Sequence, residues 1–371
     1  MLNTTSYFQE TFEESTLAFK QAVVELNKLG LSLIPHSFPI SSQSKLAVDT
    51  VYIPPASKKL GRLVILISGV HGIEGFTGSA LQTKALKENF WGKLKDDDGI
   101  LMIHSLNPYG FKNGRRVTEN NVDLNRNLDT DENLFFNENS GYEAIDLLLN
   151  PKHPVQINPL TRILFFAQAM RNVLRHSMYS LRKAVVSGQY KKKEGLFFGG
   201  HQFEPAKKIL ESVLIKYGEG YRKILLIDLH TGFGERGKLH LFADQSQYID
   251  SHILEQSFEG LSLEYGRKKD FYQVTGGLII FAAKLFWKKA IFAGICFEFG
   301  TMDSHKTLGS LDSIYRMVKE NQSHHFGVKS EHDLKTVQTQ FREMFYPSST
   351  LWRKQVEDAF EKAFSIALQN D

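Results

Sequence analysis

Short apolar runs separated by polar stretches are the main pattern along the chain. The clearest runs cover residues 46–53, 62–68, 100–104, 223–229 and 290–297. Runs of this length fit β-strands, and the consecutive apolar residues of 62–68 (RLVILIS) fit a strand that is buried on both faces. Gly69 ends that run, and Pro54 and Pro55 close the first one. The pattern therefore predicts a sheet with buried parallel strands.

Helical spacing of apolar residues occupies much of the sequence around these strands. Near the start, Phe8, Phe12 and Leu26 belong to a near-helical pattern that Gly30 is suited to end. We expect helices at residues 5–29, 75–90, 161–183 and 352–368, with further helical structure from about Ser310. Buried strands that alternate with helices are typical of α/β proteins. The sequence thus predicts one α/β domain over residues 1–371, with a mainly parallel mixed central sheet flanked by helices.

One long stretch, from about residue 129 to residue 221, separates two of the predicted core strands. It contains the expected helix 161–183 and a glycine-containing loop at 193–201 (KEGLFFGGH). We interpret this stretch as a helical insertion over one face of the same domain, and not as a second domain.

Composition narrows the class of protein. Of the 371 residues, 42% are hydrophobic, which is close to the fraction in ordinary globular proteins. The net charge is only +4, from 45 basic and 41 acidic side chains, so nothing requires a nucleic-acid partner. The one cysteine, Cys296, excludes a disulfide framework within the chain and a thiolate metal cage. Residues 1–5 show no secretory signal and no apolar run approaches the ~20 residues of a membrane helix, so we expect a cytoplasmic protein without membrane contact.

The sequence SGVHGIEG, directly after the run 62–68, holds two candidate metal ligands. His71 and Glu74 lie three residues apart, and the glycines around them allow the chain to turn so that both side chains face one ion. The end of a parallel strand is also where α/β proteins place ligands. A His-x-x-Glu pair alone is a weak signal, because it is common by chance.

A second histidine follows the run at 223–229 (KILLIDL). His230 comes directly after this run and is followed by Thr231 and Gly232. Two histidines and one glutamate from adjacent strand ends would leave a fourth position for water, which is the pattern of catalytic zinc. Asp228 is either a hydrogen-bond partner behind the His230 ring or turned away from it.

Hydrolysis at such a metal also needs a base that takes a proton from water. Glu298, within the apolar segment ICFEFGT, is the best candidate, because an unpaired carboxylate is costly in an apolar strand. A structural ion pair is the alternative interpretation of this residue.

The segment NPYGFKNGRRVTENNVDLNRN supplies several guanidinium groups close together. Asn107 and Pro108 predict a turn after the run at 100–104. Arg115, Arg116 and Arg126 follow, and arginine is suited to a carboxylate because its planar fork donates two parallel hydrogen bonds. An arginine can also stabilise an oxyanion. An exposed basic loop is the alternative interpretation.

Together these motifs resemble a known superfamily. HGIEGFTGSA, NPYGF, RRVTENNVDLNRN, DLHTG and FEFGT are similar to motifs of the zinc carboxypeptidases and of their relatives, the aspartoacylase and succinylglutamate desuccinylase group. The match looks best with a bacterial branch whose biochemical role is largely unassigned. The motifs span residues 71–301 and are specific only in combination. The resemblance implies a zinc carboxypeptidase-like fold and one zinc ion per chain.

The resemblance also assigns roles at the metal. His71, Glu74 and His230 match the three zinc ligands of the superfamily, and Glu298 matches its general base.

Further residues match substrate contacts of the superfamily. Asn125 and Arg126 match the pair that holds a substrate carboxylate, and Arg116 matches the arginine that polarises the scissile carbonyl, with Arg115 as a neighbouring alternative. The flap tyrosine of the digestive carboxypeptidases has no secure counterpart. Tyr272 lies in the right interval but without a supporting motif.

The long insertion also departs from the digestive enzymes, and its residues are candidates for the pocket wall, among them Gln189, Tyr190, Gly199, Gly200 and His201. The resemblance leads us to expect a zinc-dependent hydrolase that cleaves an amide bond in a peptide or small molecule with a carboxylate. A carboxypeptidase-type peptidase is the first reading, and a deacylase of small N-acyl amino acids is the alternative. A catalytically silent binding protein is the third, although the complete set of ligands and base speaks against it.

Overall fold

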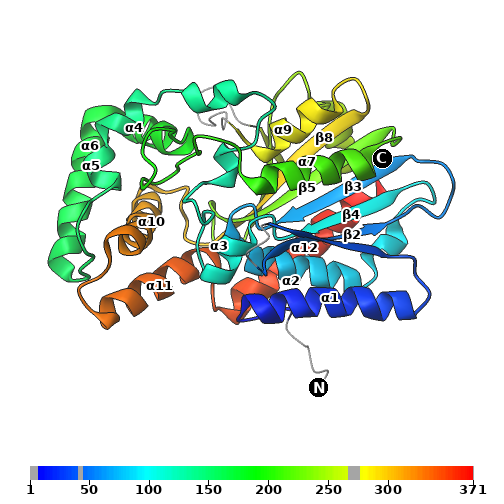
Figure 1. Ribbon diagram of the computed structural model, residues 1–371, viewed down its shortest axis with the longest axis horizontal. Coiled ribbons are helices and arrows are strands. Elements are labelled where there is room, and N and C mark those ends of the chain that lie inside the picture. Colours follow the sequence, from blue (N-terminus) through cyan, green and yellow to red (C-terminus); the bar gives the residue numbers. More distant parts are fainter. Residues whose placement is uncertain (1–6, 41–44, 266–275, 371) are drawn as a thin grey trace.

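The computed structural model describes residues 7–40, 45–265 and 276–370, which fold into one sheet with helices on both faces (Figure 1). The strands are β1 (Ile34–Pro39), β2 (Ala47–Ile53), β3 (Arg62–Ser68), β4 (Gly99–His104), β5 (Lys223–Gly232), β6 (Leu239–Ala243), β7 (Leu263–Tyr265) and β8 (Ile291–Gly300). The α-helices are α1 (Phe12–Lys28), α2 (Gly75–Lys87), α3 (Pro108–Asn113), α4 (Ser140–Ala144), α5 (Asp146–Leu149), α6 (Pro159–Val186), α7 (Pro205–Gly218), α8 (Ser251–Ser257), α9 (Leu278–Phe286), α10 (Thr307–Phe326), α11 (Glu331–Phe345) and α12 (Thr350–Gln369). Short 3-10 helices are η1 (Gly72–Glu74), η2 (Phe90–Lys93), η3 (Leu124–Arg126) and η4 (Glu132–Phe136).

The eight-stranded sheet has the order β1-β2-β4-β3-β5-β8-β6-β7. Its four central strands, β4, β3, β5 and β8, are parallel to one another. On the two sides, β2 runs antiparallel to β4 and β6 runs antiparallel to β8. This arrangement confirms the predicted α/β fold with a mainly parallel mixed sheet.

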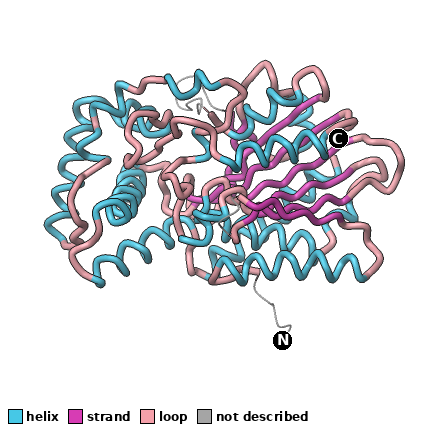
Figure 2. Tube along the Cα trace, viewed as in Figure 1, coloured by secondary structure: helices cyan, strands magenta, loops and turns pink. Residues whose placement is uncertain are grey.

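Both faces of the sheet are covered, as Figure 2 shows for the helices above and below the strands. Residues of α1, α2 and α12 pack on one face, in a cluster that includes Leu225 and Ile227 of β5. Residues of α7 and α9 pack on the other face, in a cluster that includes Ile224 and Leu226. Because successive side chains of a strand point to opposite faces, β5 needs apolar residues at every position in this stretch.

The stretch from residue 129 to residue 221 divides into two parts. Its helices α4, α5 and α6 pack with α10 in a third apolar cluster beside the sheet, on the left of Figure 1. Its last helix, α7, covers the sheet itself, with Leu210 and Leu214 in the core. Within the described ranges, no helix is both long and apolar enough to cross a membrane.

Several elements differ from the sequence-based expectations. The first helix begins at Phe12 and not at residue 5, because Thr11 and Glu14 form a capping box that starts it there. Three strands were not predicted: β1 carries two prolines and is largely exposed, whereas β6 and β7 are short. Strands β5 and β8 extend beyond their apolar runs to Gly232 and Gly300, so His230 lies inside its strand and not directly after it. Glu298 lies within β8, as the apolar segment around it predicted.

Candidate active site

The turn after β3 is tied to the segment that follows α3. The Gly72 N–H donates to the Arg116 carbonyl oxygen at 3.0 Å. A Cβ atom at Gly72 would lie 2.2 Å from the Gly110 carbonyl carbon, so only glycine fits this close approach. Glu74 lies at the end of the same turn, and its Oε1 accepts a hydrogen bond from Arg116 Nη1 at 3.2 Å. The close packing of the two segments therefore sets Arg116 beside Glu74.

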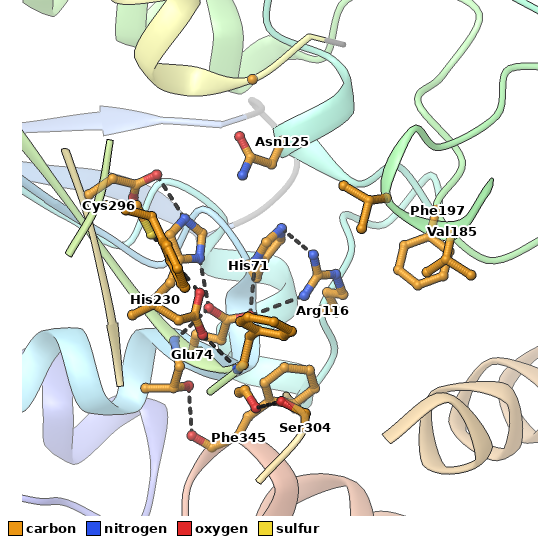
Figure 3. Close-up of a pocket in the computed structure, with 18 of the residues that line it drawn as sticks. His71, Glu74, Arg116, Asn125, Val185, Phe197, His230, Cys296, Ser304 and Phe345 are labelled. Carbon is orange, nitrogen blue, oxygen red and sulfur yellow. Dashed lines mark hydrogen bonds and ion pairs between the residues drawn. The ribbon is translucent and has the colours of Figure 1, made fainter. Parts of the chain in front are cut away.

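Three side chains from β5 and from the turn after β3 converge on one point (Figure 3). His71 Nδ1 lies 2.9 Å from Glu74 Oε1, and His230 Nδ1 lies 2.8 Å from Glu74 Oε2. One potential ligand atom from each residue lies within 4.8 Å of the other two, and all three residues are buried. Two imidazole nitrogens and one carboxylate oxygen at this spacing could bind a metal ion, and this donor set suits zinc.

Each histidine is also held from behind by a buried carboxylate. His71 Nε2 lies 3.1 Å from Asp123 Oδ1, and His230 Nε2 lies 2.7 Å from Asp228 Oδ2. Such pairs fix the orientation of the ring and, where Nε2 carries the proton, leave Nδ1 available for a metal. Arg116 Nη2 also lies 2.7 Å from His71 Nε2. Asp228 is thus a partner of His230 and is not turned away. No sequence pattern predicted a role for Asp123, although it begins the segment DLNRN.

The charges around this point are strongly coupled. Burial raises the pKa of the Glu74 carboxyl, but the positive fields of His71 and His230 outweigh it, so the net shift is downward. Burial lowers the pKa of His230, yet Asp228 and Glu74 bring it well above the usual range. Burial raises the pKa of the Asp123 carboxyl, but the positive charges of Arg116 and His71 outweigh this effect and hold the pKa well below its usual range. The carboxylates of Glu74 and Asp123 are therefore ionised at neutral pH, and their negative charge favours a cation nearby.

Glu298 lies on β8 directly opposite His230 of β5 in the strand register. Its carboxylate is half-buried on the pocket wall, and Oε1 accepts a hydrogen bond from the Phe233 N–H at 2.8 Å. Burial, followed by the negative charge of Glu74, raises the pKa of Glu298 to about 8. A carboxylate with this raised proton affinity is suited to take up and return a proton near neutral pH.

Arg115 and Arg116 point to different surroundings although they are neighbours. Arg116 lines the pocket, and its Nε donates to Asp123 Oδ2 at 3.2 Å. Arg115 does not line the pocket, because its Nε donates to Glu320 at 2.7 Å and its Nη2 to Asn121 at 3.1 Å. Of the two arginines, the structure therefore brings only Arg116 to the site.

Asn125 and Arg126 lie in η3, and both line the same pocket. The Asn125 Oδ1 accepts a hydrogen bond from the Leu278 N–H at 3.0 Å, which orients its amide. Arg126 is buried, and its Nε has no hydrogen-bond partner in the part of the chain that the structure describes. Burial lowers the pKa of this guanidinium, against the field of Asp123. Tyr272 lies outside the described residues.

The pocket around these groups has a volume of about 350 Å³ and largely apolar walls. The long stretch after residue 129 supplies Val185, Val186 and Phe197. The guanidinium of Arg116 lies 5.9 Å from the centre of the Phe197 ring. Behind the wall, the Tyr190 hydroxyl donates to the Arg126 carbonyl oxygen at 2.8 Å. Hydrophobic wall residues of this kind, such as Val185, gave no distinct sequence signal because they resemble core residues.

The fold and the site together define an α/β protein with a buried His-Glu-His group that could bind a metal. The chain belongs to the family described as "Protein of unknown function (DUF2817)", whose model matches residues 8–359. No curated protein matches this chain.

Several solved structures are similar to this chain. Thrombin activatable fibrinolysis inhibitor is 12% identical, with a TM-score of 0.50 and with 91% of this chain and 75% of that chain covered. Carboxypeptidase A from Helicoverpa armigera is 11% identical, with a TM-score of 0.47 and the same coverage of 91% and 75%. A metallo-carboxypeptidase from Pseudomonas aeruginosa is 11% identical, with a TM-score of 0.41 and coverage of 91% and 69%. At 12% identity, the likeness to thrombin activatable fibrinolysis inhibitor concerns the fold alone, and it confirms the predicted zinc carboxypeptidase-like fold.

Proposed function

We propose that the protein is a zinc-dependent hydrolase of the metallocarboxypeptidase type, which cleaves the amide bond next to the terminal carboxylate of a peptide. One observation carries the proposal: the His71, Glu74 and His230 group shares a single pocket with Glu298 and with Arg126. A metal-ligand group, a carboxylate base and a buried guanidinium are the parts that this reaction needs.

His71, Glu74 and His230 would hold the zinc ion, with Asp123 and Asp228 fixing the two imidazole rings. Bound zinc lowers the pKa of a water molecule and polarises a carbonyl group.

Glu298 accepts the proton of the attacking water and later passes it to the leaving amine. Its raised pKa supports this role, because a base with a pKa near the working pH both takes and returns a proton efficiently. The hydrogen bond from the Phe233 N–H holds one oxygen in place. The other oxygen remains for proton transfer, with Cys296 Sγ at 4.0 Å from it.

Arg116 stabilises the oxyanion that develops on the scissile carbonyl. Its guanidinium is half-buried, lines the pocket and is braced by Glu74 and Asp123 at 3.2 Å each. A donor that is already oriented before the reaction needs little reorganisation when charge develops, and this is the main source of such stabilisation.

Arg126 and Asn125 bind the substrate carboxylate and so set which amide bond is presented. Among the described residues, the buried Arg126 Nε has no partner, which supports this assignment because an unsatisfied buried donor is costly unless a ligand completes it. A bidentate pair between arginine and carboxylate also fixes the orientation of the substrate.

The test is turnover on three matched substrate sets, each with and without a zinc chelator. We expect release of the last residue from peptides with a free carboxylate, loss of that release with chelator, and no release from the same peptides with an amidated end. Faster turnover of small N-acyl amino acids would favour the deacylase alternative. Turnover that is absent on all sets would favour a silent binding protein, and turnover that resists the chelator would reject zinc.

A further inference from the structure

The pocket extends along the sheet beyond the candidate metal ligands. The strand register places His230, Glu298 and His240 in one row across β5, β8 and β6, and Asp228, Cys296 and Phe242 in the next row. Two residues advance about 7 Å along a strand, and alternate side chains share a face. Both rows therefore lie on the sheet face that α9 covers, and the second row is deeper along the strands than the candidate base.

Asp244 lies further along the same wall of the pocket. It follows the last residue of β6, two positions after Phe242, and it lines the same pocket. In the described part of the chain, Asp244 has neither a hydrogen bond nor an ion pair. Burial alone raises the pKa of its carboxyl, with no positive group to oppose the shift.

A second carboxylate oxygen in this part of the pocket also lacks a partner. Asp228 uses Oδ2 to hold His230, but its Oδ1 is buried without a hydrogen bond within the described residues. Cys296 lies between the two aspartates on the neighbouring strand. Burial, Glu298, Asp228, Glu74 and Asp244, in that order, raise the pKa of the Cys296 thiol well above its usual range. The negative charges of these carboxylates therefore disfavour the ionised form of the Cys296 thiol.

Of the positive groups that line the pocket, His230 pairs with Oδ2 of Asp228, and none pairs with Asp244 within the described residues. Arg116 is engaged by Glu74 and Asp123, and Figure 3 shows it and Cys296 on opposite sides of the two histidines. Around the aspartates the walls are apolar, with Phe242 and with Leu278 and Ile279 at the start of α9. Carboxylates in apolar surroundings are costly unless a cation pairs with them.

We propose that the part of the pocket formed by Asp228, Phe242, Asp244 and Cys296 binds a cationic side chain, so that the residue released from the substrate carries an amine or guanidinium group. Phe242 and Ile279 would pack against the aliphatic stem, and the charged end would reach the aspartates. This assignment of substrate class rests on the proposed function, because the terminal carboxylate must be held by Arg126 for the side chain to enter here.

The test is equilibrium binding of two dipeptides of matched length to the metal-free protein, acetyl-alanyl-lysine and acetyl-alanyl-norleucine. We expect the lysine ligand to bind at least about tenfold more tightly. Asp244→Asn should remove most of that preference and leave the affinity for the norleucine ligand nearly unchanged. Asp358→Asn, which removes the same charge from an exposed position on α12, is the matched control and should leave the preference intact.

Equal affinity of the two ligands, a preference for norleucine, or no binding of either one would overturn the proposal. A preference that survives in Asp244→Asn would reject the role of Asp244. The comparison in the unaltered protein stands even if the variant does not fold. Turnover of the zinc-loaded protein is measured separately: a binding preference for lysine without release of either residue would reject the proposed function and keep the pocket assignment.

Discussion

Asp123 Oδ1 lies 3.1 Å from His71 Nε2, although the two residues are 52 positions apart in the chain. The other oxygen of the same carboxylate accepts a hydrogen bond from Arg116 Nε at 3.2 Å. One buried side chain thus orients both a candidate metal ligand and a candidate oxyanion donor. Its own position is fixed by η3, which it caps through the Asn125 N–H at 3.0 Å.

Asp123→Asn should therefore weaken metal binding. We expect the zinc affinity to fall by about 10- to 100-fold, because the amide is a weaker acceptor for the imidazole N–H and does not fix the ring tautomer. Competition with a chelating dye measures this. Asp131→Asn is the control, since Asp131 caps a similar short turn through Asn133 but is exposed. Equal zinc affinity in the two variants would show that Asp123 does not support the site.

The Glu298→Gln variant should still bind the metal but lose most of its catalytic activity. The amide fills the same space and still accepts a hydrogen bond from the Phe233 N–H, but it does not take up a proton. We expect kcat to fall by about 10²- to 10⁴-fold at unchanged zinc content. Metal analysis and steady-state kinetics on the same preparation check both parts. A kcat close to that of the unaltered protein would exclude Glu298 as the base.

Arg126→Ala should act on substrates with a free carboxylate. Loss of a charge-assisted bidentate contact is expected to raise KM for such peptides by about tenfold or more. For the same peptides with an amidated end, the change should be small. The measurement is KM and kcat on matched pairs of peptides. An equal loss on both members of a pair would show that Arg126 supports the pocket and does not bind the carboxylate.

Arg115→Ala should instead lower stability. Arg115 is buried and pairs with Glu320 at 2.7 Å, so its removal leaves a poorly solvated carboxylate. We expect a loss on the order of 3 kcal/mol in the free energy of unfolding. Urea unfolding measures it, and KM of the folded fraction should not change. A raised KM with unchanged stability would indicate that Arg115 contacts the substrate.

His104 should make the protein sensitive to mild acid. This residue is buried under Phe19, with its Nε2 at 2.8 Å from the Ser79 Oγ, and burial lowers its pKa from 6.5 to about 4. Between those two values the unfolded chain binds a proton that the folded protein does not, so acid favours unfolding. The loss begins as the pH falls below about 6.5 and reaches about 3 kcal/mol near pH 4.

The difference between the unaltered protein and His104→Gln isolates this contribution from other titrating groups. The stability advantage of the unaltered protein over the variant should shrink as the pH falls from 7 to 4.5. Urea unfolding at several pH values measures the gap. A gap that is independent of pH would show that His104 does not titrate differently in the two states.

Much of the fold was predictable because it depends on local pattern. The runs at 62–68 and 100–104 became β3 and β4 with nearly the expected ends, since fully buried parallel strands need unbroken apolar sequence. Edge elements such as β1 and β7 lack that requirement, because one face or one edge is open to solvent. Their formation depends on neighbouring strands, which local pattern does not reveal.

At the site, the amino-acid sequence alone predicts which residues have metal-ligand chemistry and which strands carry them. His71 and Glu74 are close in the chain, and His230 lies on a recognisable strand. The packing of the folded chain places Asp123 beside His71, brings Arg116 and not Arg115 to the pocket, and leaves Asp244 there without a partner among the described residues. The physical reason is that these relations depend on strand register and on the packing of distant loops, where one residue of shift turns a side chain to the opposite face.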